Sequence, residues 1–182
     1  MKREVSNLKR ILVVLILNII FFPAFVFSID YDHEIKLKAM SFSWKIQQEQ
    51  LLVKVTAATE GWVGIGFNPS TRMQDANFII GYVKNGKVEV TDAFGVRPKE
   101  HVDDTSTNGR NDIISFSGNE EGGNTTIEFI IPLNSGDPAD GKINVNDITT
   151  VLLAFGKGQD DFHSRHRFRT KLEVNLATGE HQ

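Results

Sequence analysis

Residues after position 28 include two methionines and five histidines, the side chains best suited to bind a soft or borderline metal. They are Met40, Met73, His33, His101, His163, His166 and His181. A thioether is a soft ligand, and methionine with histidine is a known axial pair for haem iron in electron-transfer sites. Met73 ends a polar loop and precedes an apolar segment, so it could be held over a pocket. The alternative is that Met73 fills a gap in the core, and residue type alone favours that structural role.

A segment rich in histidine and arginine, residues 160–169, leads into the last predicted strand. If the extended backbone begins near Arg165, strand alternation places His166 on the same face as Phe168, which is the buried face. His163 then lies in the preceding turn. The arginines could form a solvated edge that deters edge-to-edge pairing, or they could bind an anion.

The segment 61–82 must position Met73, and it is predicted to form two strands joined by a loop. Its aromatic and β-branched residues favour strand, but Gly64 and Gly66 interrupt the first strand. A glycine inside a strand weakens it unless another group must approach the backbone closely. We therefore expect the first strand to be bent or to lie flat against a large ligand.

Short apolar segments with two-residue alternation recur along the chain, and no segment has the pattern of an amphipathic helix. Asn85 and Gly86 between strand-rich flanks indicate a type I′ hairpin turn. The spacing predicts an all-β fold, an antiparallel immunoglobulin-like β-sandwich of about nine to eleven strands. The main strands are expected at 35–44, 51–57, 78–83, 113–117, 125–131, 148–155 and 170–176, with polar loops at 92–110 and 134–146.

Residues 1–28 have a basic start, a long apolar run and a small residue, Ser28, at the end of the run. This layout predicts a cleaved signal peptide, with residues 29–182 forming a single domain that is secreted or periplasmic. The alternative is an uncleaved anchor, because the run is near the length of a short membrane span. Membrane association is expected only in that case.

The composition excludes several classes of site. The formal net charge is -3 and no basic stripe is present, which argues against nucleic-acid binding. Cysteine is absent, so the chain can form neither a disulfide nor a covalent c-type haem linkage. No arrangement typical of a catalytic triad or a carboxylate pair stands out, so an enzyme is not predicted.

Two acidic stretches offer carboxylates that could bind a cation, but acidic loops are usually solvated. The first is Asp75 with Asp92, Asp103 and Asp104, and the second, 137–147, lacks calcium-loop spacing.

Five motifs in this order resemble a DOMON domain, and together they cover most of residues 42–176. The strongest is a methionine before Asp-Ala and an apolar strand ending in Gly-Tyr-Val, and the second is a late histidine followed by arginine and a final strand. The motifs read GWVGIGFNPSTRMQDANFIIGYV, KNGKVEV with TDAFG, TTIEFIIPL, TTVLLAFG and DDFHSRHRFRTKLEVNL.

The resemblance implies a non-covalent haem b held by a methionine and a histidine, as in the cytochrome domain of cellobiose dehydrogenase. The methionine corresponds to Met73 and the histidine to His166, with Arg169 next in register and His163 as the second choice. The chain has Thr170 where the family often has glycine after the arginine. The implied role is electron transfer with a redox partner protein, without catalysis by the domain itself.

Other DOMON domains are haem-free, so the resemblance also allows a module that binds a sugar or another small ligand. In that case Trp62, Phe67 and Tyr82 would be the stacking walls of the pocket, although such aromatic residues more often belong to a core. A third reading is an accessory domain that stabilises a partner enzyme and binds no ligand.

Overall fold

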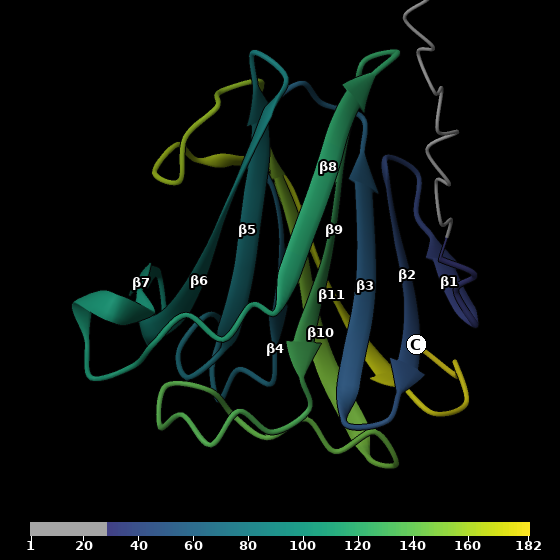
Figure 1. Ribbon diagram of the computed structural model, residues 1–182, viewed down its shortest axis with the longest axis vertical. Helices are drawn as coiled ribbons and strands as arrows, with labels where there is room; N and C mark the ends of the chain where they lie inside the picture. Colours follow the sequence, from purple (N-terminus) through teal and green to yellow (C-terminus); the bar gives the residue numbers. More distant parts are fainter. Residues whose placement is uncertain (1–28) are drawn as a thin grey trace, which may run out of the picture.

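The computed structural model describes residues 29–182, and the predicted signal peptide at 1–28 lies outside this range. Within it, eleven strands form two antiparallel sheets that pack face to face, and one short 3-10 helix lies outside them (Figure 1). This arrangement confirms the predicted all-β antiparallel sandwich and its strand number. No helix in residues 29–182 is long and apolar enough to cross a membrane.

The first sheet has five strands in the order β1-β2-β3-β9-β8. Their bounds are β1 His33–Lys36, β2 Met40–Gln47, β3 Gln50–Ala57, β8 Ser115–Glu121 and β9 Asn124–Pro132.

The second sheet has six strands in the order β11-β10-β4-β5-β6-β7 and carries both sequence segments that were singled out for chemistry. Its strands are β4 Val63–Phe67, β5 Asn77–Lys84, β6 Lys87–Arg97, β7 Glu100–Asp103, β10 Ile148–Gly156 and β11 His166–Asn175, and the 3-10 helix η1, Asp104–Ser106, follows β7.

The main core lies between the two sheets and follows the predicted alternation. In β3, the apolar residues Leu51, Val53 and Val55 are buried, while Lys54 between them is half-buried. β9 pairs with β3 in register, so its apolar residues enter the same layer. Burial of these side chains is the main favourable contribution to folding, at about 25 cal/mol per Å² of apolar surface.

The predicted turn at Asn85 and Gly86 is confirmed by the backbone. Both residues have positive φ, 52° and 75°, as a type I′ turn requires. The turn joins β5 to β6, and Lys84 pairs with Lys87 across it.

The prediction of a polar loop at 92–110 is wrong for the first half of that segment. β6 continues to Arg97, Pro98 and Lys99 form a tight turn, and β7 pairs back with β6 from Glu100. Ala93 and Phe94 pair with β5 on one side and with β7 on the other. Tertiary pairing therefore overrides the polar composition of the segment.

Candidate functional site

A second apolar cluster lies on the face of the six-stranded sheet that points away from the five-stranded sheet. Successive residues of β4 point to opposite faces of the sheet. Val63 and Ile65 face the main core, whereas Gly64 and Gly66 face outward and leave room for this cluster. We call this group the outer-face cluster. Its buried members are Trp62, Ala76, Phe78, Ile80 and Ala93, and Met73, Tyr82, Leu152, Ala154 and Phe162 pack against them.

The glycines of this face accommodate aromatic rings of the protein itself. A Cβ at Gly66 would lie 2.4 Å from Cε1 of Phe78, and one at Gly156 would lie 2.5 Å from Nε1 of Trp62. The sequence predicted that the glycine-rich strand was bent or lay flat against a large ligand. In the structure the close contacts are made by Phe78 and Trp62 instead, as the cross-strand pair Gly66–Phe78 requires.

Met73 lies on the loop between β4 and β5 and packs, half-buried, against the outer-face cluster. The loop is fixed to β6, because the Asp75 amide donates to the Gly95 carbonyl at 2.7 Å and the Gly95 amide donates to Ala76 at 2.9 Å. Arg72 and Asp75 both adopt positive φ, 56° and 62°. The backbone on both sides of the thioether is therefore held in one conformation.

The loop 157–165 covers the other end of the same face. Trp62 Nε1 donates to Ser164 Oγ at 2.9 Å, and the ring of Phe162 lies 4.8 Å from that of Tyr82. The Asp161 carboxylate accepts the amide of His163 at 2.7 Å and so shapes the turn. This loop brings His163 next to a residue, Phe162, that belongs to the cluster.

His166 does not share the buried face of β11, so the predicted placement of its side chain is wrong. Phe155 pairs with Phe168, but the next residue, Gly156, pairs with His166, so β11 contains one additional residue at this point. Such a bulge reverses the alternation of the residues before it. His166 is exposed, whereas Phe168 packs against the main core as predicted.

Arg169 is exposed and pairs across the sheet with Ala154, which packs against the outer-face cluster. Directly opposite residues of an antiparallel pair point to the same side of the sheet. Arg169 therefore shares the outer face, where its guanidinium could meet an anionic group of a ligand.

The predicted aromatic walls divide between the two faces. Phe67 is fully buried in the main core with Val63 and Ile65, so it cannot line a pocket on the outer face. Trp62 and Tyr82 belong to the outer face. The parity of β4 already separates Phe67 from Trp62, since residues five apart in a strand point to opposite sides.

His101 was not singled out from the sequence, yet the fold brings it to the same face. Its ring lies 5.7 Å from that of Phe78, and the residue is half-buried. Burial lowers the pKa of His101, and the positive charge of nearby His163 lowers it further. A neutral imidazole is the form that binds a metal. Residue type was the only sequence signal for His101, because β7 was predicted as loop.

His101 makes a pH-dependent contribution to stability. Because its pKa is lower in the folded chain than in the unfolded chain, the unfolded state binds more protons as the pH falls below about 6.5. The stabilising effect of a neutral His101 is complete above that pH and is lost as the pH falls through the folded pKa. We expect His101→Gln to flatten the loss of stability between pH 7 and pH 5 in urea titrations, whereas His181→Gln at an exposed site should not. Equal slopes for the wild type and His101→Gln would contradict this assignment.

The two segments reach the outer face from opposite ends. The loop 68–76 joins β4 and β5 beyond the pair Phe67–Asn77, and the loop 157–165 leaves β10 beyond the pair Val63–Phe155. The Met73 side chain packs on this apolar surface, and the loop that carries the exposed His163 borders it through Phe162. These donors, with the apolar wall and an exposed arginine, fit the ligand chemistry of a non-covalent haem.

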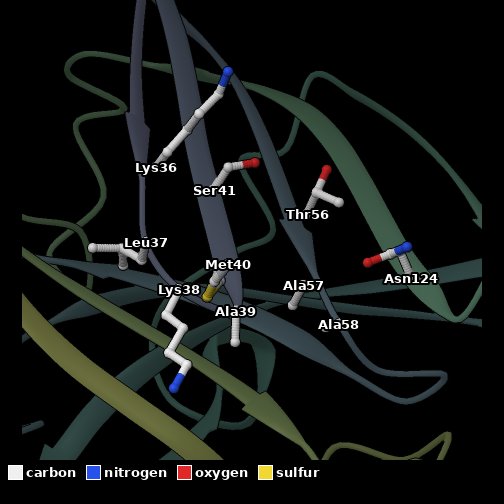
Figure 2. Close-up of a pocket in the computed structure, with 10 residues that line it drawn as sticks. All are labelled: Lys36, Leu37, Lys38, Ala39, Met40, Ser41, Thr56, Ala57, Ala58 and Asn124. Carbon is white, nitrogen blue, oxygen red and sulfur yellow. The ribbon is translucent and has the colours of Figure 1, made fainter.

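Two surface depressions lie elsewhere in the described part of the chain, and of the candidate metal-binding side chains they include only Met40. One of about 270 Å³ lies at the end of β2 and β3, where Met40, Ala57 and Asn124 are among its lining (Figure 2). The other, about 200 Å³, borders β8 and β9. Neither connects the donors of the outer face.

Comparisons with known proteins assign the fold to a family. Residues 36–156 match the family model described as DOMON domain. The chain is 29% identical over 141 residues to "MOXD1 homolog 2" of Drosophila melanogaster, which covers 75% of this chain and 18% of that protein. It is 30% identical over 83 residues to "DBH-like monooxygenase protein 1" of Mus musculus, covering 41% of this chain and 14% of that protein. The chain thus spans less than a fifth of the length of these curated relatives.

Solved structures share the fold at low sequence identity. The cytochrome b domain of pyranose dehydrogenase from Coprinopsis cinerea superimposes with a TM-score of 0.56 and 13% identity, covering 76% of this chain and 78% of that one. The cytochrome domain of Myriococcum thermophilum cellobiose dehydrogenase gives a TM-score of 0.48 and 8% identity, covering 78% and 77%.

Proposed function

The chain belongs to the DOMON family, and on that premise we propose that it is an exported haem b-binding domain that transfers electrons and catalyses no reaction by itself. The observation that carries the proposal is the convergence of the Met73 thioether and the His163-bearing loop on one apolar sheet face. The fold is also that of a cytochrome b domain of a sugar dehydrogenase, which supports the same reading.

Met73 and His163 would donate to the haem iron. His166 was the first choice from the sequence, and both histidines are exposed. His163 is preferred because it directly follows Phe162 of the outer-face cluster, whereas His166 lies at the bulge of β11. His101 is the second imidazole of this face and the alternative donor. Held by a methionine and a histidine, the haem would supply electron transfer without oxygen activation, and the methionine would raise its reduction potential.

The remaining residues of the face have distinct roles in this proposal. Trp62, Phe78 and Tyr82 would supply an apolar surface that excludes water from the haem, and Arg169 would neutralise one of its carboxylates. The Ser164 hydroxyl fixes the ring of Trp62 through its indole N–H. An exposed edge of the face would allow electron exchange with a redox partner protein.

The first test is an absorption spectrum of the protein from haem-supplied cells, recorded before and after dithionite. We expect a Soret band with sharp reduced α and β bands, because two strong axial ligands give low-spin iron. Met73→Leu should retain haem but change the reduced spectrum. Met40→Leu is the matched control, since Met40 is buried at the opposite sheet and should leave the spectrum unchanged.

Histidine variants separate the three candidate imidazoles. His163→Ala should lose most of the haem, whereas His166→Ala and the exposed-site control His181→Ala should retain it. Loss of haem in His101→Ala instead would move the ligand to β7, and loss in His166→Ala would restore the choice made from the sequence. A wild-type protein that stays colourless when haemin is added would refute the haem proposal.

The second candidate is a haem-free module that binds a sugar or another small ligand on the same face. It is favoured by the rings of Phe78 and Trp62, which already occupy the space above Gly66 and Gly156. A colourless protein that binds in a glycan screen, with the binding abolished by Tyr82→Ala, would support this candidate.

A further inference from the structure

Three aspartates from separate segments meet at one end of the sandwich. Asp92 lies in β6, Asp104 in η1 after β7, and Asp140 in the loop between β9 and β10. Each offers a carboxylate oxygen, and the three oxygens lie within 4.8 Å of one another. Calcium binds oxygen ligands at about 2.3–2.6 Å, so oxygens on opposite sides of one ion are about 5 Å apart. A single ion could therefore contact all three carboxylates.

Two of these aspartates are buried and Asp140 is half-buried, yet four of their six carboxylate oxygens have no hydrogen-bond partner among residues 29–182. Asp92 and Asp104 are each only 1% exposed. Within residues 29–182, Asp92 Oδ1, both carboxylate oxygens of Asp104 and Asp140 Oδ1 accept no hydrogen bond. None of the three aspartates forms a salt bridge in that range either. Buried charges are normally paired or bound to a metal. These oxygens have no such partner in the described part of the protein, which indicates that a cation outside the chain binds them.

Electrostatics agrees with the geometry. Burial raises the pKa of Asp92 to about 8, of Asp104 to about 7 and of Asp140 to about 6, and repulsion from neighbouring aspartates, Asp112 among them, adds to each rise. Like charges this close cannot all remain ionised in a site of low polarity. Either protons or a cation must neutralise them.

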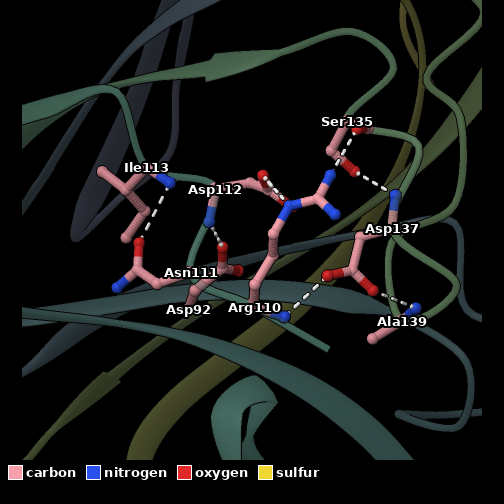
Figure 3. A network of polar contacts seen from close by, with 8 residues as sticks. All are labelled: Asp92, Arg110, Asn111, Asp112, Ile113, Ser135, Asp137 and Ala139. Carbon is pink, nitrogen blue, oxygen red and sulfur yellow. Dashed lines mark hydrogen bonds and ion pairs between the residues drawn. The ribbon is translucent and has the colours of Figure 1, made fainter. Parts of the chain in front are cut away.

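Hydrogen bonds connect the segments that surround Asp92 (Figure 3). The Asp112 amide donates to Asp92 Oδ2 at 2.9 Å, and the Arg110 amide donates to Asp137 Oδ2 at 2.6 Å. The guanidinium of Arg110 bridges Asp112 at 3.0 Å and the Ser135 carbonyl at 2.7 Å. These contacts join the segment after η1 to the loop that carries Asp140.

Gly109 allows these two loops to approach closely. A Cβ at this position would lie 2.9 Å from the Cβ of Ala139 and 3.2 Å from that of Asp104. The close packing places Asp104 beside the loop of Asp140 and keeps solvent from the carboxylates.

We propose that Asp92, Asp104 and Asp140 bind one calcium ion, which joins β6, η1 and the loop between β9 and β10. The ligands are all hard oxygens, as calcium requires, and no nitrogen or sulfur donor belongs to the group. Calcium tolerates irregular geometry and six to eight oxygens, whereas magnesium demands a near-ideal octahedron. The ion would stabilise the sheet edge that carries His101, and it is separate from the proposed haem face.

The sequence pointed to a different acidic group. Asp75 and Asp103, which were weighed with Asp92 and Asp104, are exposed and lie outside the cluster. The third member of the cluster is instead Asp140, which lies in a loop about 36 residues after Asp104. The spacing of a calcium loop is absent because the ligands come from three segments.

The experiment is a calcium titration of the EDTA-treated full chain by calorimetry, together with thermal unfolding in 10 mM CaCl₂ or in EDTA. We expect one calcium per chain with a Kd on the order of 10⁻⁴ M or tighter. At about 100 times Kd, mass action should raise Tm by on the order of 5–10 °C. Asp104→Asn and Asp140→Asn should weaken binding at least about 10-fold and remove the calcium-dependent rise in Tm.

Asp147→Asn is the matched control, because Asp147 is an exposed acid near Asp140 whose carboxylate only accepts from Asn144. It should respond to calcium like the wild type. The cluster variants should fold in EDTA with a Tm equal to or above that of the wild type, because each removes a repelling charge. Three outcomes would overturn the proposal: no binding by the wild type at 10 mM, undiminished binding by Asp104→Asn and Asp140→Asn, or an equal response to magnesium.

Discussion

Replacing Trp44 by alanine is expected to lower the free energy of unfolding by about 4 kcal/mol. Trp44 is fully buried in β2, and its ring stacks on that of Phe42 with centroids 4.5 Å apart. Its indole N–H donates to the carbonyl of Leu176 at 2.8 Å. Leu176 follows β11, so this one side chain links the five-stranded sheet to the last strand of the six-stranded sheet. Truncation would open a large cavity and also leave a buried carbonyl unpaired.

Urea unfolding of the wild type and two variants measures the effect of Trp44. Trp44→Phe keeps most of the apolar volume and removes the hydrogen bond, so we expect a loss of about 1–3 kcal/mol. Phe116→Ala is the control, because Phe116 is 49% exposed and its loss should cost less than about 0.5 kcal/mol. If Trp44→Ala and Phe116→Ala cost the same, the link between the sheets has no energetic importance.

Gly95→Ala is the second change with a large expected effect, about 3 kcal/mol of destabilisation. A Cβ at Gly95 would lie 1.7 Å from the carbonyl oxygen of Met73 and 2.7 Å from its carbonyl carbon. Both are backbone atoms, so no side-chain rotation can relieve the clash. The loop that carries Met73 must move away from β6. The hydrogen bonds from the Asp75 amide to the Gly95 carbonyl and from the Gly95 amide to the Ala76 carbonyl must then lengthen or break.

Gly141→Ala is the matched control for Gly95→Ala. Among the described residues, a Cβ at Gly141 would meet no atom within 4 Å, and its φ is not positive. This variant should be neutral or stabilising by up to about 1 kcal/mol, because alanine restricts the unfolded chain. If haem binds as proposed, Gly95→Ala should also alter the reduced spectrum, since it displaces Met73. A normal melting temperature for Gly95→Ala would show that the loop of Met73 is not held against β6.

Local sequence patterns determined most of the fold. The alternation in β3 and β9 predicted which side chains are buried, since a strand exposes successive residues to opposite faces. Asn85 and Gly86 predicted their turn because a type I′ turn needs positive φ at two successive residues. Segment type and local parity are encoded by neighbouring residues, so a single sequence is sufficient for them.

The tertiary structure alone decided which candidate site residues lie on a common face. The bulge in β11 depends on pairing with β10, and it turned His166 away from the face that parity predicted. His101 joined the outer face because β7 pairs with β6, and polar composition gave no signal for that pairing.

The same reason explains the acidic cluster and the two faces of the second sheet. Asp92, Asp104 and Asp140 come from a strand, a 3-10 helix and a loop, and they become neighbours only when these three segments pack together. The sequence could nominate Met73 and a late histidine by residue type, but their common surface exists only after β4, β5 and β10 are joined. Contacts between distant segments depend on strand order and register, and neither is written in the local alternation of side chains.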